Sequence, residues 1–183
     1  SIDYCSKFIN YLSEIQSELI DKYKNNKYSP AYPTLNVGKI NGGLAVNIIP
    51  NKCVMEFEIR DTPEMESKLF INKIKKFLKE LELDMKKKVK NCKIELEVKN
   101  NFPPLLTDNS SNFISLCLQA LKKNSTSAVS FGTEAGIFNE IGFETIVCGP
   151  GSIKQAHKPN EFVEIKQLDK CRNFLLKLIE LQY

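Results

Sequence analysis

The sequence predicts an α+β unit over residues 1–101, followed by an α/β unit over residues 102–183. In the first unit, long stretches with apolar residues at helical spacing alternate with stretches in which apolar and polar residues alternate. After Pro103-Pro104, short apolar runs alternate with helical patterns, which is typical of a parallel α/β layer. A chain of 183 residues, 42% of them hydrophobic, is long enough for two small domains.

The first unit should begin with a long amphipathic helix over residues 2–24. Its apolar positions are Cys5, Phe8, Leu12, Ile15 and Leu19. A strand around Leu35 and Val37 follows, and Gly42-Gly43 then permits a turn. We expect the apolar run 44–49 to be the second strand of a hairpin, and Pro50 to end this strand.

A further strand is predicted over residues 52–60 by a strict alternation. Cys53, Met55, Phe57 and Ile59 should face a core, whereas Glu56, Glu58 and Arg60 should face away from it. A second helix should begin at Pro63 and bury Phe70, Ile74, Phe77 and Leu81. Ile94, Leu96 and Val98 indicate one more strand. This order matches a βαββαβ sandwich that lacks its first strand, so we expect the chain to begin inside a domain.

The second unit should contain two short strands among helices. The predicted strands are 128–131 and 145–148, and the predicted helices are 113–121, 134–141 and 168–181. Two strands make an incomplete sheet.

Composition excludes several classes of protein. The single histidine, His157, rules out a self-contained zinc site built from several histidines. The net charge of +4 comes from lysine clusters without interleaved aromatic residues, which argues against nucleic acid as a partner. Charged residues interrupt segment 1–20, so we expect no signal peptide and no membrane partner. The six cysteines lie far apart at apolar positions, which favours reduced thiols and a cytoplasmic protein.

Two loops contain candidate site residues. In the run 130–136, Gly132 should end a strand and Thr133 should cap a helix, either as structure alone or to hold a substrate carboxylate. Glu134 is a site residue or merely a favourable first-turn acid. His157 follows the glycine-rich loop 149–152 and is either an ordinary surface histidine or a metal ligand whose other ring nitrogen is held by Glu161. Both loops should meet at one edge of the sheet.

A third candidate is the pair Asn47 and Arg60. Because both are expected near the ends of adjacent strands, an amide and a guanidinium would form a clamp for a carboxylate or carbonyl. The alternative is an edge amide and a solvated arginine.

Four runs together resemble one known family. They are 38–50, 56–60, 131–136 and 149–159, and they look like the acetylornithine deacetylase branch of the M20 family of zinc aminoacylases and peptidases. The resemblance covers essentially the whole chain. The glycine-threonine-glutamate-alanine run at 132–135 separates the chain from the succinyl-diaminopimelate desuccinylase branch.

The resemblance implies a hydrolase in which two zinc ions, or cobalt, activate water against the amide of an N-acyl amino acid such as N-acetylornithine, as in arginine biosynthesis. It makes His157 the last metal ligand. It makes Asn47 and Arg60 lid residues that reach the substrate, and Gly132 with Thr133 the loop that holds the substrate's carboxylate. No catalytic residue is assigned within the chain.

The resemblance also implies a ferredoxin-like lid over residues 1–101 that forms a homodimer, and over residues 102–183 the last part of the zinc-peptidase-like α/β catalytic domain. The family's other metal ligands and its general base have no match here, so we expect this chain to be the C-terminal half of the enzyme and inactive by itself. Two alternatives remain open: a non-catalytic dimerisation module, and another M20 amidohydrolase such as an aminoacylase or a succinyl-diaminopimelate desuccinylase.

Overall fold

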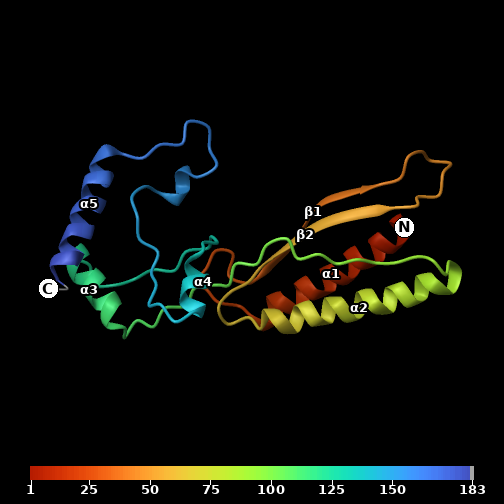
Figure 1. Cartoon of the computed structure of the whole chain (residues 1–183), viewed down its shortest axis with the longest axis horizontal. Coiled ribbons are helices and arrows are strands. Elements are labelled where there is room, and N and C mark those ends of the chain that lie inside the picture. The colour runs from red at the N-terminus through yellow and green to blue at the C-terminus, as the bar shows by residue number, and fades with distance from the viewer. Residues whose placement is uncertain (182–183) are drawn as a thin grey trace. The chain divides into compact units, whose positions relative to one another are not determined.

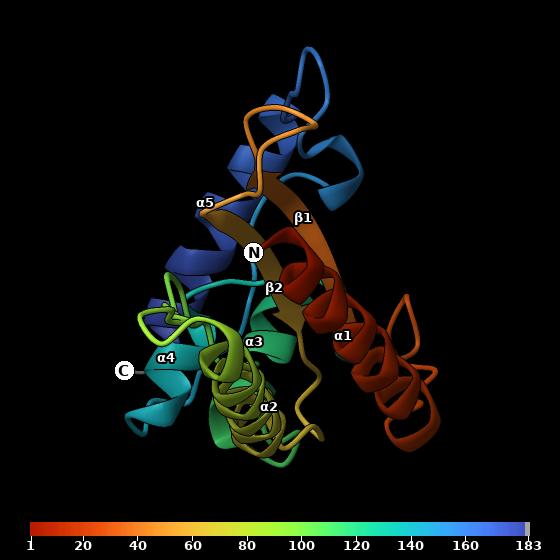
Figure 2. The same cartoon turned by 90° about the vertical axis from the view of Figure 1, so that its right-hand side faces the viewer.

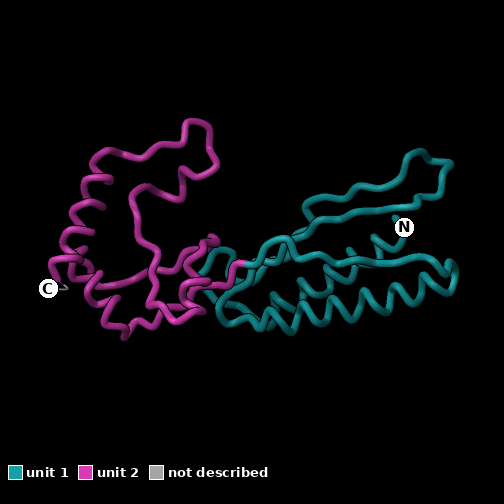
Figure 3. Tube along the Cα trace, in the orientation of Figure 1, with its two compact units in different colours: residues 1–101 teal, residues 102–183 magenta. Residues whose placement is uncertain are grey.

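The computed structural model describes residues 1–181, and the chain separates into two units, Ser1–Asn101 and Phe102–Tyr183 (Figure 3). None of the helices in the described residues is long and apolar enough to cross a membrane.

The first unit opens with helix α1, Ile2–Lys22. The helix buries the predicted apolar stripe of Phe8, Leu12, Ile15 and Leu19. An apolar side chain every three or four residues places the whole stripe on one face of the helix, so the helix can cover a sheet along its full length.

Two antiparallel strands form the sheet of this unit, β1 over Thr34–Gly42 and β2 over Cys53–Arg60 (Figure 1). Thr34 pairs with Arg60 at one end, and Gly42 pairs with Cys53 at the other. Half-buried and exposed residues alternate along β2, which confirms the two faces predicted for it.

The predicted strand 44–49 is wrong, because these residues belong to the loop that joins β1 to β2. Gly43 has φ +84°, and the chain then turns, with the Ile48 N–H donating to the Ala45 carbonyl at 3.1 Å. Val46 is fully exposed. This turn interrupts the extended backbone that a strand requires, so the apolar run does not become one.

Helix α2 spans Ser67–Lys88. It begins later than predicted from Pro63, because the preceding residues form a turn in which the Met65 N–H donates to the Thr62 carbonyl at 2.9 Å. The helix buries Phe70, Ile74, Leu78 and Leu81. The predicted core residue Phe77 is only partly buried and stacks on Tyr11, with 3.9 Å between the ring centroids.

The segment after α2 runs back along the core but is not a strand, contrary to prediction. Ile94 and Leu96 are partly buried against the core, and the Ile94 N–H donates to Glu82 at 2.7 Å. A strand needs a neighbour that supplies its hydrogen bonds. Among the described residues, β1 is the only strand that pairs with β2, and no strand lies beside residues 94–98.

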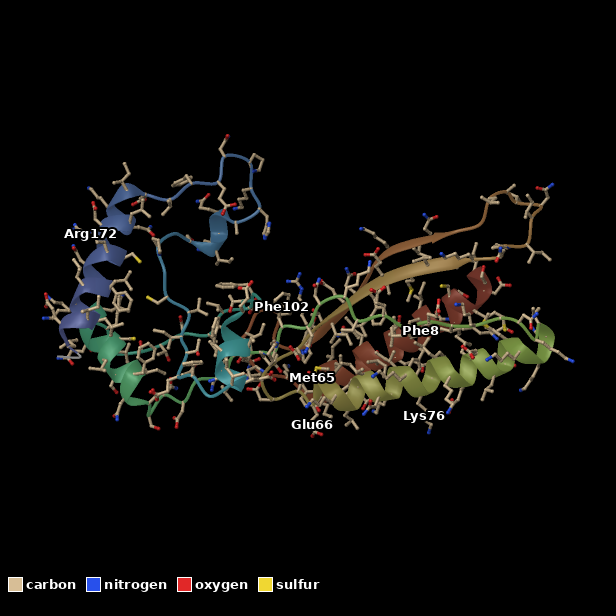
Figure 4. The ribbon with its side chains drawn as sticks, viewed as in Figure 1. Phe8, Met65, Glu66, Lys76, Phe102 and Arg172 are labelled. Carbon is tan, nitrogen blue, oxygen red and sulfur yellow. The ribbon has the colours of Figure 1, made fainter. Side chains whose placement is uncertain are left out.

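Both helices cover the same face of the hairpin (Figures 1 and 2), which makes this unit a two-layer α+β structure. Phe8 of α1 meets Phe57 of β2 edge to face, at 5.6 Å between ring centroids. Phe8 and Met65 mark its two buried clusters (Figure 4). The clusters comprise Phe8, Leu12, Ile74, Leu78 and Leu81, and Ile15, Leu19, Met65 and Phe70. The coarse α+β prediction agrees with this arrangement.

The second unit contains α3 over Asn112–Leu121, α4 over Ala135–Glu140, the short 3-10 helix η1 over Ile153–Gln155, and α5 over Ile165–Glu180. The Ser111 hydroxyl caps α3 by accepting from two backbone N–H groups. Helices α3 and α5 pack together, and their buried side chains are Ile114, Cys117 and Phe174.

The predicted strands 128–131 and 145–148 are not formed, so the described residues of this unit contain no parallel α/β layer. Val129 and Val147 are 44% and 45% exposed. A strand needs a neighbouring strand that supplies its hydrogen bonds. Neither segment has one among the described residues, so their apolar sequence does not produce a sheet.

Two apolar residues of α1 should contribute differently to the free energy of unfolding. Replacing Leu12, which is 1% exposed, with alanine should lower the free energy of unfolding by about 2–5 kcal/mol, because it leaves a cavity between α1 and α2. Ile20 lies on the same helix but is 37% exposed, so Ile20→Ala should cost much less. Urea denaturation of both variants measures the difference, and equal losses would contradict the packing described.

The Cys5 thiol should resist alkylation in the folded chain. Burial raises its pKa to about 11, and the adjacent Cys53 thiol adds to the effect. Because the unfolded thiol ionises near pH 8.5, at about its ordinary pKa, the folded state binds more protons above that pH. This group's contribution to stability therefore falls as the pH rises toward 11. Alkylation at pH 8.5, followed by mass spectrometry, should label Cys5 slowly in the native chain and rapidly in urea; equal rates would contradict this.

Gly132, which precedes α4, and Gly136, which lies within it, should differ in their tolerance of substitution by alanine. Gly136 is buried in α4, where an added Cβ would collide with the carbonyl oxygen of Pro103, so Gly136→Ala should destabilise the second unit. Gly132 has open space around its Cα, so Gly132→Ala should leave stability nearly unchanged. Thermal melting of both variants tests the contrast, which would be refuted by a larger loss for Gly132→Ala.

Candidate functional site

The loop over residues 43–52 forms the distal end of the β-hairpin and contains Asn47. Beside it lies a hollow of about 620 Å³. Its lining includes Lys39, Asn41, Ile49, Pro50, Lys52 and Glu56. The Ser1 hydroxyl donates to the Pro50 carbonyl at 2.8 Å, which ties the end of the loop to the start of α1. The hollow is thus lined by both apolar and charged side chains.

Asn47 and Arg60 do not form the predicted clamp. Asn47 lies in the loop rather than on a strand, whereas Arg60 is at the opposite end of β2, paired with Thr34. Because β2 is eight residues long, at roughly 3.3 Å per residue its ends lie about 23 Å apart. One small substrate cannot touch both side chains within one copy of this unit.

Arg60 also has acidic neighbours. Its Nε donates to Glu58 at 3.0 Å. Asp61 follows it, and burial raises the pKa of this carboxyl, although the Ser67 hydroxyl that donates to it has the opposite effect. The carboxylate of Glu58 therefore already offsets the charge of the guanidinium, which weakens its attraction for a substrate carboxylate.

Thr133 lies one residue before the N-cap of α4, which is Glu134, so the predicted Thr133 cap is wrong by one residue. The Thr133 hydroxyl nevertheless accepts from the Ala135 N–H at 3.2 Å, at the first turn of α4. One backbone donor that an anion would use is thus already occupied. Gly132 precedes it in open space, and Glu134 is exposed, with its carbonyl accepting from Ile137 at 2.9 Å.

His157 lies in an exposed loop between η1 and α5. Its backbone has φ +60°, an uncommon value for a residue other than glycine. Its N–H donates to the Glu161 carboxylate at 3.2 Å. The Glu161 carboxylate thus binds the backbone of His157, and the expected contact to a ring nitrogen stays a prediction. Upstream, the Gly151 N–H donates to Gln167 at 2.5 Å, which ties the loop to α5.

The two predicted loops of the second unit are not brought together. Helix α4, which follows Thr133, and η1, which precedes His157, lie apart in both views (Figures 1 and 2). In residues 1–181, no three histidine, cysteine, aspartate or glutamate side chains are grouped so that they could hold a metal ion. His157 therefore fits one ligand position and cannot hold a metal by itself.

Sequence reasoning missed the turn that follows His157. Asn160 has φ +59°, and the Glu161 N–H donates to the Lys158 carbonyl at 3.2 Å. The signal was present in the Pro159-Asn160 pair, which is typical of a tight turn.

Comparison with known proteins identifies relatives over nearly the whole chain. A family profile described as "Peptidase dimerisation domain", of the M20 family, matches residues 9–86. The chain is 33% identical over 180 residues to an acetylornithine deacetylase of Buchnera aphidicola subsp. Acyrthosiphon pisum (strain Tuc7), which covers 98% of this chain and 45% of that protein.

Two further acetylornithine deacetylases are also similar. The one of Pasteurella multocida (strain Pm70) is 31% identical over 179 residues, covering 98% of this chain and 45% of the relative. The one of Myxococcus xanthus is 26% identical over 173 residues, covering 94% and 44%. The chain thus spans about half the length of the curated relatives it matches. On these matches, the chain belongs to the M20 family and is similar to its acetylornithine deacetylase branch.

Proposed function

We propose that this chain is part of a zinc-dependent amidohydrolase that removes the acetyl group from N-acetylornithine. The observation that supports this most strongly is the similarity to acetylornithine deacetylases over 98% of the chain. That similarity extends beyond the dimerisation domain, into the second unit with its two candidate loops.

His157 is the metal ligand in this proposal. Bound zinc would supply a Lewis acid for the amide carbonyl and an activated water. The resemblance to the family places the other ligands and the general base outside this chain, and the described residues contain no group of side chains able to hold a metal. By itself, the chain should therefore be inactive.

Substrate contacts are proposed for the residues that the resemblance points to. Asn47 would reach the substrate from the loop of the hairpin, and the Gly132-Thr133 segment would lie near its carboxylate. Arg60 would contact the substrate separately from Asn47, because the two residues lie at opposite ends of the hairpin.

We also propose a homodimer formed through the first unit, since the match to the peptidase dimerisation domain covers both of its helices and both strands up to residue 86. Six free cysteines among the described residues support a cytoplasmic location. A second candidate is a non-catalytic dimerisation module, which the single histidine of the chain favours.

His157→Ala should abolish N-acetylornithine hydrolysis and lower the zinc content of a holoenzyme that contains this chain, because an imidazole ligand is lost. Lys158→Ala is the matched control, since it changes the neighbouring exposed side chain and should keep both properties. Ornithine release and metal content by elemental analysis are the measurements.

The chain by itself, mixed with zinc or cobalt and N-acetylornithine, provides the second control and should release no ornithine. Steady turnover by the isolated chain would contradict the proposal that the other metal ligands lie outside it. Normal zinc content and rate in the His157→Ala holoenzyme would refute the role of His157.

A further inference from the structure

The backbone of His157 has an uncommon conformation that one neighbouring carboxylate contacts. Among the described residues other than glycine, only Lys122, His157 and Asn160 have positive φ. Lys122 ends helix α3 and Asn160 lies within a turn, both positions where such a φ is usual. His157 comes directly after Ala156, the C-cap residue of η1, and its N–H donates to the Glu161 carboxylate, a contact that favours its conformation.

The local sequence explains how Glu161 reaches that N–H. Residues 158–161 form a turn closed by the hydrogen bond from Glu161 to the Lys158 carbonyl. Proline at the second position and a positive φ at the third, here Asn160, are the marks of a type II turn. The turn reverses the chain, so the Glu161 side chain comes back beside the residue that precedes the turn.

We propose that Glu161 is a positioning residue for His157. By accepting the His157 N–H, its carboxylate holds φ near +60° and thereby sets the direction in which the imidazole leaves the backbone. A left-handed residue is disfavoured without such a contact. The inference deepens the proposed function, because the direction of the imidazole matters only if His157 binds a metal or another ligand.

The chain contains one histidine, so its NMR signals are unambiguous. Glu161→Ala should speed amide hydrogen exchange at His157 about tenfold, because a charge-assisted hydrogen bond is lost, and should change the coupling between its amide and α protons. Glu161→Gln keeps an acceptor oxygen and should restore most of the wild-type behaviour. Glu164→Ala removes a nearby exposed carboxylate and should change neither signal.

Substitutions of Asn160 provide a second, independent test of the same inference. Asn160→Gly keeps a residue that accepts positive φ, so the turn and the His157 signals should persist. Asn160→Ala disfavours that φ and should reproduce the effect of Glu161→Ala. Unchanged exchange and coupling in Glu161→Ala would overturn the inference, as would equal effects of the two Asn160 variants.

Metal binding gives a readout beyond local structure. In a zinc-loaded enzyme that contains this chain, Glu161→Ala should weaken zinc affinity about tenfold in competition with a chelator, with Glu161→Gln closer to wild type. Unaltered zinc affinity in Glu161→Ala would overturn the positioning role. The NMR measurements need no metal, so they separate failure of this inference from failure of the proposed function. If Glu161→Ala alters the His157 signals but even the wild-type enzyme binds no zinc, only the proposed function is refuted.

Discussion

The packing of α1 and α2 against one face of the β1–β2 hairpin is the constraint on which the first unit depends. Alternation along β2 directs Phe57 and its neighbours toward the helices, where Phe8 meets them edge to face. Because one face of the sheet is buried, a shift of register by one residue would expose the whole apolar set. This packing therefore fixes the register of the hairpin, and with it the place of the loop that carries Asn47.

An antiparallel hairpin necessarily separates residues at its two ends. Asn47 lies beyond the end where Gly42 pairs with Cys53, and Arg60 lies at the end where it pairs with Thr34. The candidate residues of the second unit also lie on separate loops. Groups this dispersed can act on one substrate only when further surfaces join them, which agrees with the match to a dimerisation domain and with relatives about twice as long.

His157 differs from the other candidates because its geometry is set almost entirely by its own neighbours in sequence. Pro159 and Asn160 favour the turn, and the turn brings Glu161 to the His157 backbone. In the proposed function, this turn would orient His157 through residues next to it in the sequence.

The sequence by itself determined the elements whose hydrogen bonds are internal or whose faces are set by a clear period. Helix α1, the two faces of β2 and most of the buried stripe of α2 follow from spacing alone. Tertiary structure decided the segments 44–49, 94–98, 128–131 and 145–148, which read as strands but form none. The physical reason is that a helix satisfies its backbone within its own residues, whereas a strand depends on a neighbouring segment that its own sequence does not specify.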